Sequence, residues 1–459
     1  MVSRNTIVSY IEKIYNKEKN KLKDILGRIP NRICLTSDVW TASTSEGYIC
    51  LTAHFVDERW RLTSCVLNFC RMKPPHNGIA LEATLFDCLK QWGIDKKVFS
   101  ITLDNASSND NMQDHLKKHL CVQSNLLCDG EYFHVRCSVH ILNLIVQEGL
   151  KVANEALKKI RESVKYIKGS DGRMIKFKDC VNDAGISLTG GLRLDVSTRW
   201  NSTYLMLESA LKYRKAFEFF QVADMNYKHC PSDEDWERGE SILWKVQCIL
   251  EENQDQVDDV IREMATDMKT KFDKYGKEYS VVLAFVVILD PRLKVPFLKY
   301  CYTTLDALTC NVKLKNVEDK FRVLYQEYVN IFNHQSVVLS QSSQDSNSLS
   351  KSSREGSKTK KCKIISGFKN FQNQPISDTG KSELDAYLEE KSIEVDEEHY
   401  EDFEVLLYWK INEKKYHVLS LMARDVLSIP ITTIASESSF SIGGRVLTKY
   451  RSSTLPDHI

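Results

Sequence analysis

The chain has 459 residues and a formal net charge of +1; 42% of its residues are hydrophobic and 27% are charged. This length accommodates roughly two or three domains with cores of their own, and the composition is that of an ordinary globular protein. The sequence has no apolar run long enough to span a membrane and no apolar core of a secretory signal near Met1, so we expect neither, and no membrane partner. Its fourteen cysteines follow no repeating framework, which favours reduced thiols in the cytosol or nucleus. Because the net charge is close to zero, any DNA-binding surface must be a local patch.

The first 150 residues combine helix and strand patterns. Residues 1–30 carry apolar side chains at helical spacing, which predicts a lead-in helix. Stretches rich in aromatic and β-branched residues then predict strands. The predicted order is strands over 33–40, 47–56 and 60–69, a helix over 80–92, a strand over 98–104, a helix over 109–120, a strand over 132–135 and a helix over 138–150. A meander followed by strands joined through helices is the order of an RNase H-like core, although pattern alone leaves other α/β folds open.

The rest of the chain is predicted to be helical apart from one polar stretch. Helical periodicity runs from about 150 to 333 and returns over 382–459. Between them, residues 334–380 are rich in Ser, Lys, Gln and Asn, which predicts a disordered linker. The basic cluster 358–363 in this linker suits a nuclear-localisation patch, a nonspecific DNA contact or a solvated run.

Three acidic residues stand in distinctive contexts. Asp38 and Asp104 each close an apolar strand pattern and lie 66 residues apart, which leaves room for the hairpin, the third strand and one crossover helix. Carboxylates at the ends of neighbouring strands can hold two divalent cations, as phosphodiester chemistry requires. Glu437 lies far later in the chain. The structural alternative is that each aspartate is a turn residue and that Glu437 occupies the first turn of a helix capped by Thr432 or Thr433.

Cys137 and His140 open the helix that follows the last predicted strand. These two residues could form a zinc site together with Cys121, Cys128 and His134, which lie nearby in the sequence. The spacing is irregular, however, and no second Cys or His pair with zinc-ligand spacing is present, so we expect no zinc. The alternative is that Cys137 and His140 position substrate or neighbouring carboxylates.

Arg199 and Trp200 are adjacent in the segment 195–203. An aromatic side chain next to an arginine can stack on an unpaired base, which is worth about 1–3 kcal/mol per base, and the arginine can face a phosphate. The alternative is that Trp200 is an ordinary core residue of an amphipathic helix.

An apolar set near the C-terminal end of the sequence is too dense for a solvated tail. Some of its members must pack against the core, and the others should form a self-complementary patch that supports a two-fold dimer. The set consists of Val426, Leu427, Ile429, Phe440, Val446 and Leu447.

The contexts of Asp38, Asp104 and Glu437, together with the Cys-x-x-His motif, the Trp200 segment and the C-terminal run, resemble the hAT family of DNA transposases. The resemblance extends over nearly the whole chain and is closer to the plant RICESLEEPER and DAYSLEEPER-type members. It implies an α/β fold in which an RNase H-like core is interrupted by a large all-α insertion and a helical C-terminal segment dimerises. The implied parts are a helical lead-in (1–30), an RNase H-like core (31–150), a helical insertion (151–333), a disordered linker (334–380) and a dimerisation region that completes the catalytic core (381–459).

The resemblance also implies functional residues. It makes Asp38, Asp104 and Glu437 the catalytic, metal-binding carboxylates of a DDE-type site that uses Mg²⁺ or Mn²⁺. The DNA-binding residues that it implies are Arg199, Trp200, Cys137 and His140.

Three departures from the family pattern bear on function. No BED-type zinc finger precedes the core in this sequence, Ser438 stands where many active members carry arginine, and the sequence ends at Ile459, where relatives usually continue. We therefore expect a nuclear, DNA-binding, self-associating protein (a homodimer or higher homo-oligomer), domesticated or truncated relative to a mobile transposase. An active transposase that performs metal-dependent strand cleavage and transfer is the first alternative, and a non-transposase RNase H-like nuclease is the second.

Overall fold

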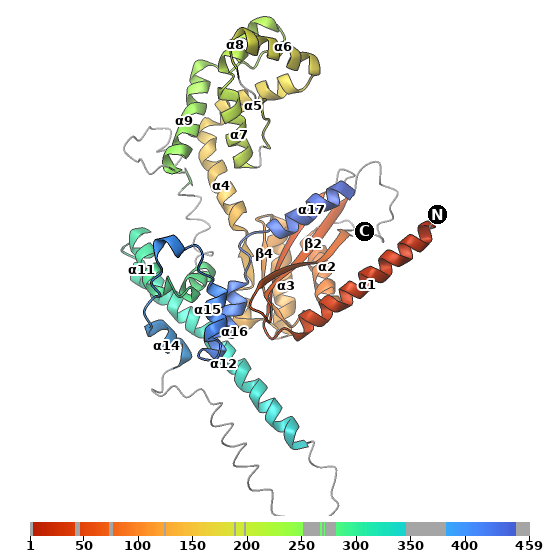
Figure 1. Cartoon of the computed structure of the whole chain (residues 1–459), viewed down its shortest axis with the longest axis vertical. Helices are drawn as coiled ribbons and strands as arrows, with labels where there is room; N and C mark the ends of the chain where they lie inside the picture. The colour runs from red at the N-terminus through yellow and green to blue at the C-terminus, as the bar shows by residue number, and fades with distance from the viewer. Residues whose placement is uncertain are drawn as a thin grey trace, which may run out of the picture. The chain divides into compact units, whose positions relative to one another are not determined.

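The computed structural model describes most of the chain (Figure 1). The described residues are 3–41, 46–72, 77–123, 125–187, 190–196, 199–250, 267–268, 270, 281–305, 307–345 and 382–446. The chain divides into two compact units, of which the first comprises Met1–Cys137 with Glu278–Ile459 and the second comprises Ser138–Lys277. The chain therefore leaves the first unit after its last strand and returns to it later.

A five-stranded mixed sheet lies at the centre of the first unit. Its strands are β1 (Ile33–Thr41), β2 (Gly47–Val56), β3 (Leu62–Met72), β4 (Val98–Leu103) and β5 (His134–Arg136), in the spatial order β3-β2-β1-β4-β5. Neighbours among β1, β2 and β3 pair antiparallel, whereas β4 pairs in parallel with both β1 and β5. The predicted meander followed by strands joined through helices is confirmed, and with it an α/β fold.

Three helices cover one face of this sheet: α1 (Arg4–Arg28), α2 (Gly78–Trp92) and α3 (Ser107–Val122), which the short helix η1 (Leu127–Gly130) follows. The side chain of Asn77 caps α2 by accepting a hydrogen bond from the Ala80 N–H. Gly93 ends α2 with a φ of +69°, a conformation that favours glycine because it has no Cβ. The core on this face includes Leu26, Leu35, Leu51, Leu85 and Leu116.

The C-terminal part of the first unit packs against the other face. Its elements are a helix over 281–289, α11 (Lys294–Leu305), α12 (Cys310–Asp345), α14 (Glu383–Glu389), η3 (Glu397–His399), α15 (Val405–Asn412), α16 (His417–Leu427) and α17 (Ile434–Val446). A second core joins them to the sheet and includes Cys34, Val56, Phe285, Phe321 and Met422. None of the described helices is long and apolar enough to cross a membrane.

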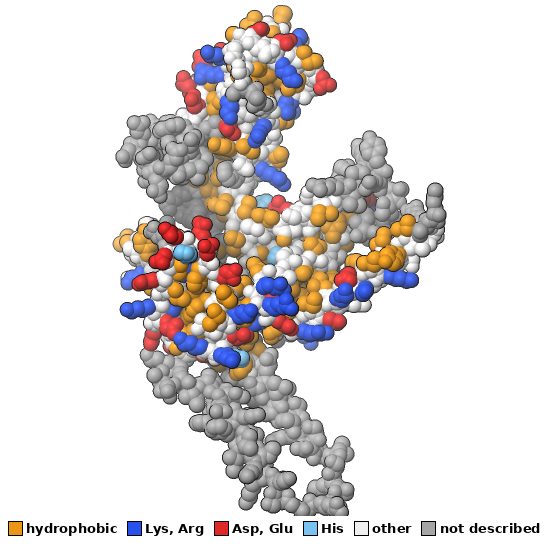
Figure 2. All heavy atoms as spheres, in the orientation of Figure 1, with side chains coloured by type: hydrophobic (Ala, Val, Ile, Leu, Met, Phe, Trp, Pro, Cys, Tyr) orange, Lys and Arg blue, Asp and Glu red, His pale blue; other side chains and the backbone are white. Residues whose placement is uncertain are grey.

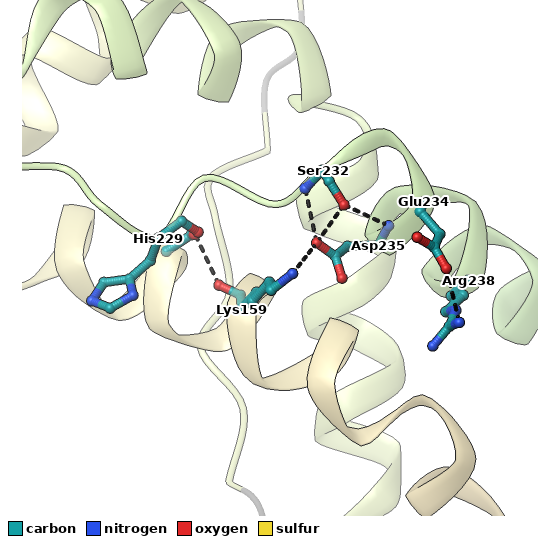
Figure 3. Close-up of polar contacts among 7 residues, drawn as sticks. Lys159, His229, Ser232, Glu234, Asp235 and Arg238 are labelled. Atoms are coloured by element: carbon teal, nitrogen blue, oxygen red, sulfur yellow. Dashed lines mark hydrogen bonds and ion pairs between the residues drawn. The ribbon is translucent and has the colours of Figure 1, made fainter.

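All the regular secondary structure described in the second unit is helical. It contains α4 (Ser138–Leu150), η2 (Lys151–Ala153), α5 (Asn154–Lys168), α6 (Asp171–Asp183), α7 (Trp200–Leu211), α8 (Arg214–Ala223) and α9 (Asp233–Leu250). Figure 3 shows how the start of α9 is tied to α5: the Asp235 carboxylate accepts hydrogen bonds from the Ser232 hydroxyl (2.7 Å) and from the Lys159 ammonium group (2.8 Å). Burial would raise the pKa of Asp235, but these bonds outweigh it and hold the pKa below its usual value.

Three boundaries differ from the predicted ones. The helix α12 continues to Asp345, so the linker prediction was wrong for residues 334–345, and the remainder of that linker lies outside the described residues. Extending a packed helix is easier than nucleating one, which allows a Ser- and Gln-rich stretch to continue it. The segment 281–333 packs with the sheet rather than with the second unit, and α4 already belongs to the second unit. Helical periodicity indicates that one face of a helix is buried, but it does not identify which part of the protein covers that face.

Candidate active site

Asp38 and Asp104 lie on neighbouring strands at the same level of the sheet. In the parallel pair of β1 and β4, Cys34 lies opposite Ser100 and Thr36 opposite Thr102. Continuing this register by two residues places Asp38 opposite Asp104, the first residue after β4. Adjacent strands lie about 4.8 Å apart. The structure therefore brings the first two predicted carboxylates to one edge of the sheet, and both residues are half-buried.

The segment that carries Glu437 is anchored at this edge by three polar contacts. The hydroxyl oxygens of Thr36 and Ser436 lie 3.0 Å apart. The Thr102 hydroxyl donates to the Pro430 carbonyl at 2.5 Å, and the Thr433 hydroxyl donates to the Cys137 thiol at 3.5 Å. These contacts connect the start of α17 to β1, to β4 and to the end of β5.

The contacts also identify the face of the sheet on which the aspartates lie. Alternate residues of a strand point to the same face. Asp38 therefore shares a face with Thr36, which meets Ser436, and with Trp40, whose ring stacks on that of Phe440 at a centroid distance of 5.9 Å. Both neighbours of Asp38 on this face contact α17, so Asp38 faces the helix that contains Glu437.

Close packing fixes α17 along the sheet. The Phe440 ring also lies 5.9 Å from the Phe69 ring of β3. A Cβ on Gly443 would lie only 2.7 Å from Cζ of Phe69, so only glycine allows this approach of the helix backbone. The packed face of α17 thus consists of Ser436, Phe440 and Gly443, at helical spacing.

Glu437 follows Ser436 and is half-buried at the margin of this packed face. It occupies the first turn of α17, and its N–H donates to the Thr433 carbonyl at 3.1 Å. Among the described residues, no group of three or more His, Cys, Asp or Glu side chains is assembled closely enough to hold a metal ion. The structure pairs the two aspartates by register and anchors the Glu437 helix at the same edge, and the complete three-carboxylate site stays a prediction.

The surroundings of Asp104 include polar residues that sequence reasoning missed. Oδ1 of Asp104 accepts hydrogen bonds from the Ala106 N–H at 3.0 Å and from Nδ2 of the buried Asn109 at 2.5 Å. The Arg136 guanidinium lies at the end of the next strand and pairs with Asp110 at 3.0 Å. Asn109 thereby fixes one oxygen of Asp104. The signal that could have found Asn109 is its position in the first turn of the helix after the strand.

A buried histidine extends the contact between Thr36 and Ser436 into β2. Nε2 of His54 lies 3.0 Å from the Thr36 hydroxyl. Burial lowers the pKa of His54 to about 4, so the ring is neutral near pH 7. His54, Thr36 and Ser436 therefore form a line of neutral hydrogen-bonding groups beneath the paired aspartates.

Comparison with known proteins agrees with this architecture. Four family models match the chain: the ZBED1 RNase-like domain over residues 36–132, the ZBED1 RNase-like helical domain over 135–245, the hAT-like transposase RNase-H fold over 241–328, and the hAT family C-terminal dimerisation region over 383–459. The zinc finger BED domain-containing protein RICESLEEPER 2 of Oryza sativa subsp. japonica is 34% identical, with 100% of this chain and 68% of the relative aligned. The chain belongs to the hAT family.

Further hAT relatives show the same extent of similarity. RICESLEEPER 1 of Oryza sativa subsp. japonica is 34% identical over 97% of this chain and 66% of its own length. The putative AC transposase of Zea mays is 31% identical over 98% of this chain and 58% of its own length. This chain therefore spans about two thirds or less of the length of these two relatives.

The structure bears differently on the two residues of the Cys-x-x-His motif, Cys137 and His140. Cys137 is only 1% exposed, and its thiol accepts the hydrogen bond from Thr433. Because Cys137 is buried, it cannot make the direct contact with DNA that was predicted. Its hydrogen bond with Thr433 makes it a positioning residue for the segment before α17. His140 is half-buried in the second unit, and its role at DNA stays a prediction.

The segment that contains Arg199 and Trp200 is held by a residue that sequence reasoning did not single out. The fully buried Asp195 carboxylate pairs with the Arg161 guanidinium of α5 through two nitrogens, with Nη2 at 2.7 Å from Oδ2, and accepts a hydrogen bond from the Thr203 hydroxyl at 3.0 Å. Arg199 is exposed immediately before α7. The side chain of Trp200 and the basic cluster 358–363 lie outside what the structure describes.

Most of the apolar set predicted near the C-terminal end packs against its own chain. Val426, Ile429 and Phe440 are buried, so these members cannot form the predicted self-association patch. These three side chains cover the sheet and its adjoining core, because α16 and α17 lie directly on these parts of the first unit. The side chains of Val446 and Leu447 lie outside the described residues. The apolar side chains that α17 exposes are instead Ile434 and Ile442, of which Ile442 is 67% exposed.

Proposed function

We propose that this chain is a DNA-binding, self-associating protein of the hAT transposase type whose Asp38, Asp104 and Glu437 carboxylates bind a divalent cation. The observation that carries the proposal is the register that sets Asp38 opposite Asp104, at the edge where the start of α17 is anchored. In this account the second unit is the helical insertion of the family, and the C-terminal part completes the carboxylate site.

The donor chemistry fits Mg²⁺ or Mn²⁺, which prefer carboxylate oxygens. Asp38 and Asp104 would supply two adjacent carboxylates, and Glu437 would supply a third from the first turn of α17. The hydrogen bonds from the Ala106 N–H and the Asn109 side chain to one oxygen of Asp104 orient its carboxylate. A bound cation would polarise a phosphodiester and lower the pKa of an attacking water or hydroxyl.

Self-association is proposed through the C-terminal dimerisation region. The exposed face of α17 carries Ile434 and Ile442, which lie eight residues apart and thus close to one side of the helix. A two-fold pairing of this face is the simplest closed assembly. DNA contact is proposed for the exposed Arg199 with Trp200 and His140, and nuclear localisation follows from a DNA-directed role.

The retained pairing of Asp38 and Asp104 supports a second candidate, an active transposase that cleaves and transfers DNA strands. Ser438 is exposed beside Glu437, where many active members carry arginine, which favours binding without transposition. Membership of the hAT family leaves no observation in favour of an unrelated RNase H-like nuclease.

A combined binding and cleavage assay tests the proposal. The purified chain is mixed with labelled duplex DNA in Mg²⁺ or Mn²⁺, and retention and nicking are followed on the same samples. We expect the unmodified chain and each variant to bind DNA, and we expect any nicking activity to be abolished in Asp38→Asn and Asp104→Asn. The exposed Asp114 of α3 provides the matched control, because Asp114→Asn removes a carboxylate away from the sheet edge. Absence of DNA binding by the unmodified chain would overturn the proposal, and nicking that survives both substitutions would overturn the assigned site.

A further inference from the structure

The lead-in helix α1 carries a continuous apolar stripe that its own protein covers only in part. Leu26, near the C-terminal end of the helix, is fully buried against the sheet, and Leu22 is partly buried beside it. Towards the N-terminus the stripe continues on the surface, where exposures lie between 46% and 66%, and Figure 2 shows hydrophobic side chains along this half of α1. The exposed members are Ile7, Tyr10, Ile11, Ile14 and Tyr15. A stripe of this size is typical of an interaction surface.

The charge of α1 restricts what can cover this stripe. The helix contains seven basic and three acidic residues, a net charge of +4. Lys13 and Lys17 flank the exposed stripe, and neither has an ion pair with a described residue. Two copies of α1 would repel each other, whereas an acidic surface with apolar side chains would complement the helix.

Such a surface occurs elsewhere in the same chain. Residues 389–404, here called the acidic segment, contain nine acidic residues and one lysine, a net charge of −8. Two of its apolar side chains, Ile393 and Tyr400, are exposed. In Figure 2 acidic side chains gather over the part of the unit that contains α14 and α15. Its exposed carboxylates without an ion pair to a described residue are Glu394, Asp396, Glu398, Glu401, Asp402 and Glu404.

The acidic segment is held in place by the turn before α11. The Ile393 N–H donates to the Pro291 carbonyl at 2.9 Å. The Arg292 guanidinium donates to the Tyr400 carbonyl at 2.6 Å and lies 4.5 Å from the centre of the Tyr400 ring. A surface fixed in this way loses little conformational entropy when a partner binds.

The two surfaces belong to opposite sides of one unit. The buried end of α1 is part of the core that also includes α2 and α3, whereas the elements around the acidic segment pack in the core on the other face of the sheet. The sheet lies between them, so α1 cannot reach the acidic segment of its own copy. We propose that α1 of one copy docks on the acidic segment of a second copy, through an interface separate from the exposed face of α17.

Charge reversal on each side tests this contact in the full chain. Lys13→Glu with Lys17→Glu changes α1, and Glu394→Lys with Glu398→Lys changes the acidic segment. We expect each double variant alone to weaken self-association by about tenfold or more in sedimentation velocity, because like charges then face each other at the changed positions and the net charge falls to 0 on α1 or to −4 on the acidic segment. A mixture of the two variants should associate again, since the reversed helix of one meets the reversed segment of the other. The control Lys158→Glu with Lys176→Glu alters two exposed lysines of the second unit. It changes the net charge as much as the α1 variant does and should leave self-association unchanged.

Each other outcome contradicts the proposal. If reversal of α1 weakens association and reversal of the acidic segment does not, the stripe is covered by another α1 or by a segment outside the described residues. If reversal of α1 lowers only the affinity for DNA, the helix is a nucleic-acid contact. A mixture that fails to associate, while both variants melt at the temperature of the unmodified chain, would exclude the contact. Metal binding and nicking report on the carboxylate site separately, so failure of this inference leaves the proposed function intact.

Discussion

The hydroxyl groups of Thr36 and Ser436 lie 3.0 Å apart although 400 residues separate them in the chain. Thr36 is two residues before Asp38 on a central strand, and Ser436 directly precedes Glu437 on α17. This contact therefore determines how closely the helix that carries the predicted third carboxylate approaches the paired aspartates. Because both residues are buried, the contact is sheltered from competing water.

Removal of the Thr36 hydroxyl should destabilise the first unit. Thr36→Val keeps the shape of the side chain but leaves Nε2 of His54 and the Ser436 hydroxyl without this partner, and buried groups left unpaired cost about 1–3 kcal/mol. Urea denaturation measures the loss in the free energy of unfolding. Thr41→Val, at the exposed end of the same strand, should change it by less than about 0.5 kcal/mol. Equal stability of the two variants would show that the contact does not hold α17 on the sheet.

A methyl group on Gly443 should displace α17 from the sheet. The added Cβ would lie 2.7 Å from Cζ of Phe69, and that ring is packed against Tyr48 at 5.5 Å and cannot move freely. We expect Gly443→Ala to lower the free energy of unfolding by about 1–3 kcal/mol, as overpacking does. In Gly27→Ala the added methyl group meets no atom within 4 Å, so this helical variant should be neutral or slightly stabilised. A stable Gly443→Ala protein would contradict the close approach of α17 to β3.

The buried His54 should make stability depend on pH. Its pKa is about 4 in the folded protein and about 6.5 when unfolded, so between these values the unfolded chain binds the extra proton. The contribution of His54 to the free energy of unfolding is therefore fully present above about pH 6.5, and it falls by about 3 kcal/mol as the pH drops to 4. His54→Gln cannot titrate, so the difference in unfolding free energy between it and the unmodified chain should shift by this amount across the same window.

The comparison with His54→Gln is needed because Asp425 acts in the opposite direction. Burial raises the pKa of Asp425 to about 6, so its contribution to stability is present at low pH and is lost as the pH rises through 6. Asp425 is unchanged in both proteins, and its effect cancels in the difference. A difference that does not vary with pH would show that His54 is accessible to protons in the folded protein.

An aspartate at Ile442 should weaken self-association through α17. Ile442 is 67% exposed in the region that matches the hAT dimerisation model, and a charge there would be buried without a partner in a two-fold interface. We expect Ile442→Asp to raise the dissociation constant at least about tenfold by light scattering over a range of concentrations. Val222→Asp, on an apolar residue of the second unit that is 85% exposed, should associate like the unmodified chain. If both variants behave alike, α17 is not an interface.

Local patterns in the sequence were sufficient to predict the strands that Asp38 and Asp104 end. That these two strands are neighbours followed only from the RNase H-like fold, which the resemblance to hAT transposases favoured over other α/β folds. The anchoring of Glu437 could not be predicted in this way, since Thr36 and Ser436 carry no signal that they meet. The buried pair of Asp195 and Arg161 was missed for a similar reason: charged residues are usually exposed, and only the tertiary structure shows that these two satisfy each other.

The C-terminal apolar set shows the same limitation. A dense apolar pattern predicts burial, and Val426 and Phe440 are indeed buried, but by their own chain. The pattern does not distinguish a core from an interface. Ile442, the residue that the structure leaves exposed, was not part of the predicted set.

Binding of Mn²⁺, followed by electron paramagnetic resonance, is the most direct test of the carboxylate site. The unmodified chain should bind Mn²⁺, and Asp38→Asn, Asp104→Asn and Glu437→Gln should each weaken binding by about tenfold or more, because each removes one anionic ligand. The exposed Asp114→Asn control should bind like the unmodified chain. If Asp38→Asn and Asp104→Asn bind Mn²⁺ as tightly as the control, these two aspartates do not form a metal site, and the proposed function of the sheet edge is wrong.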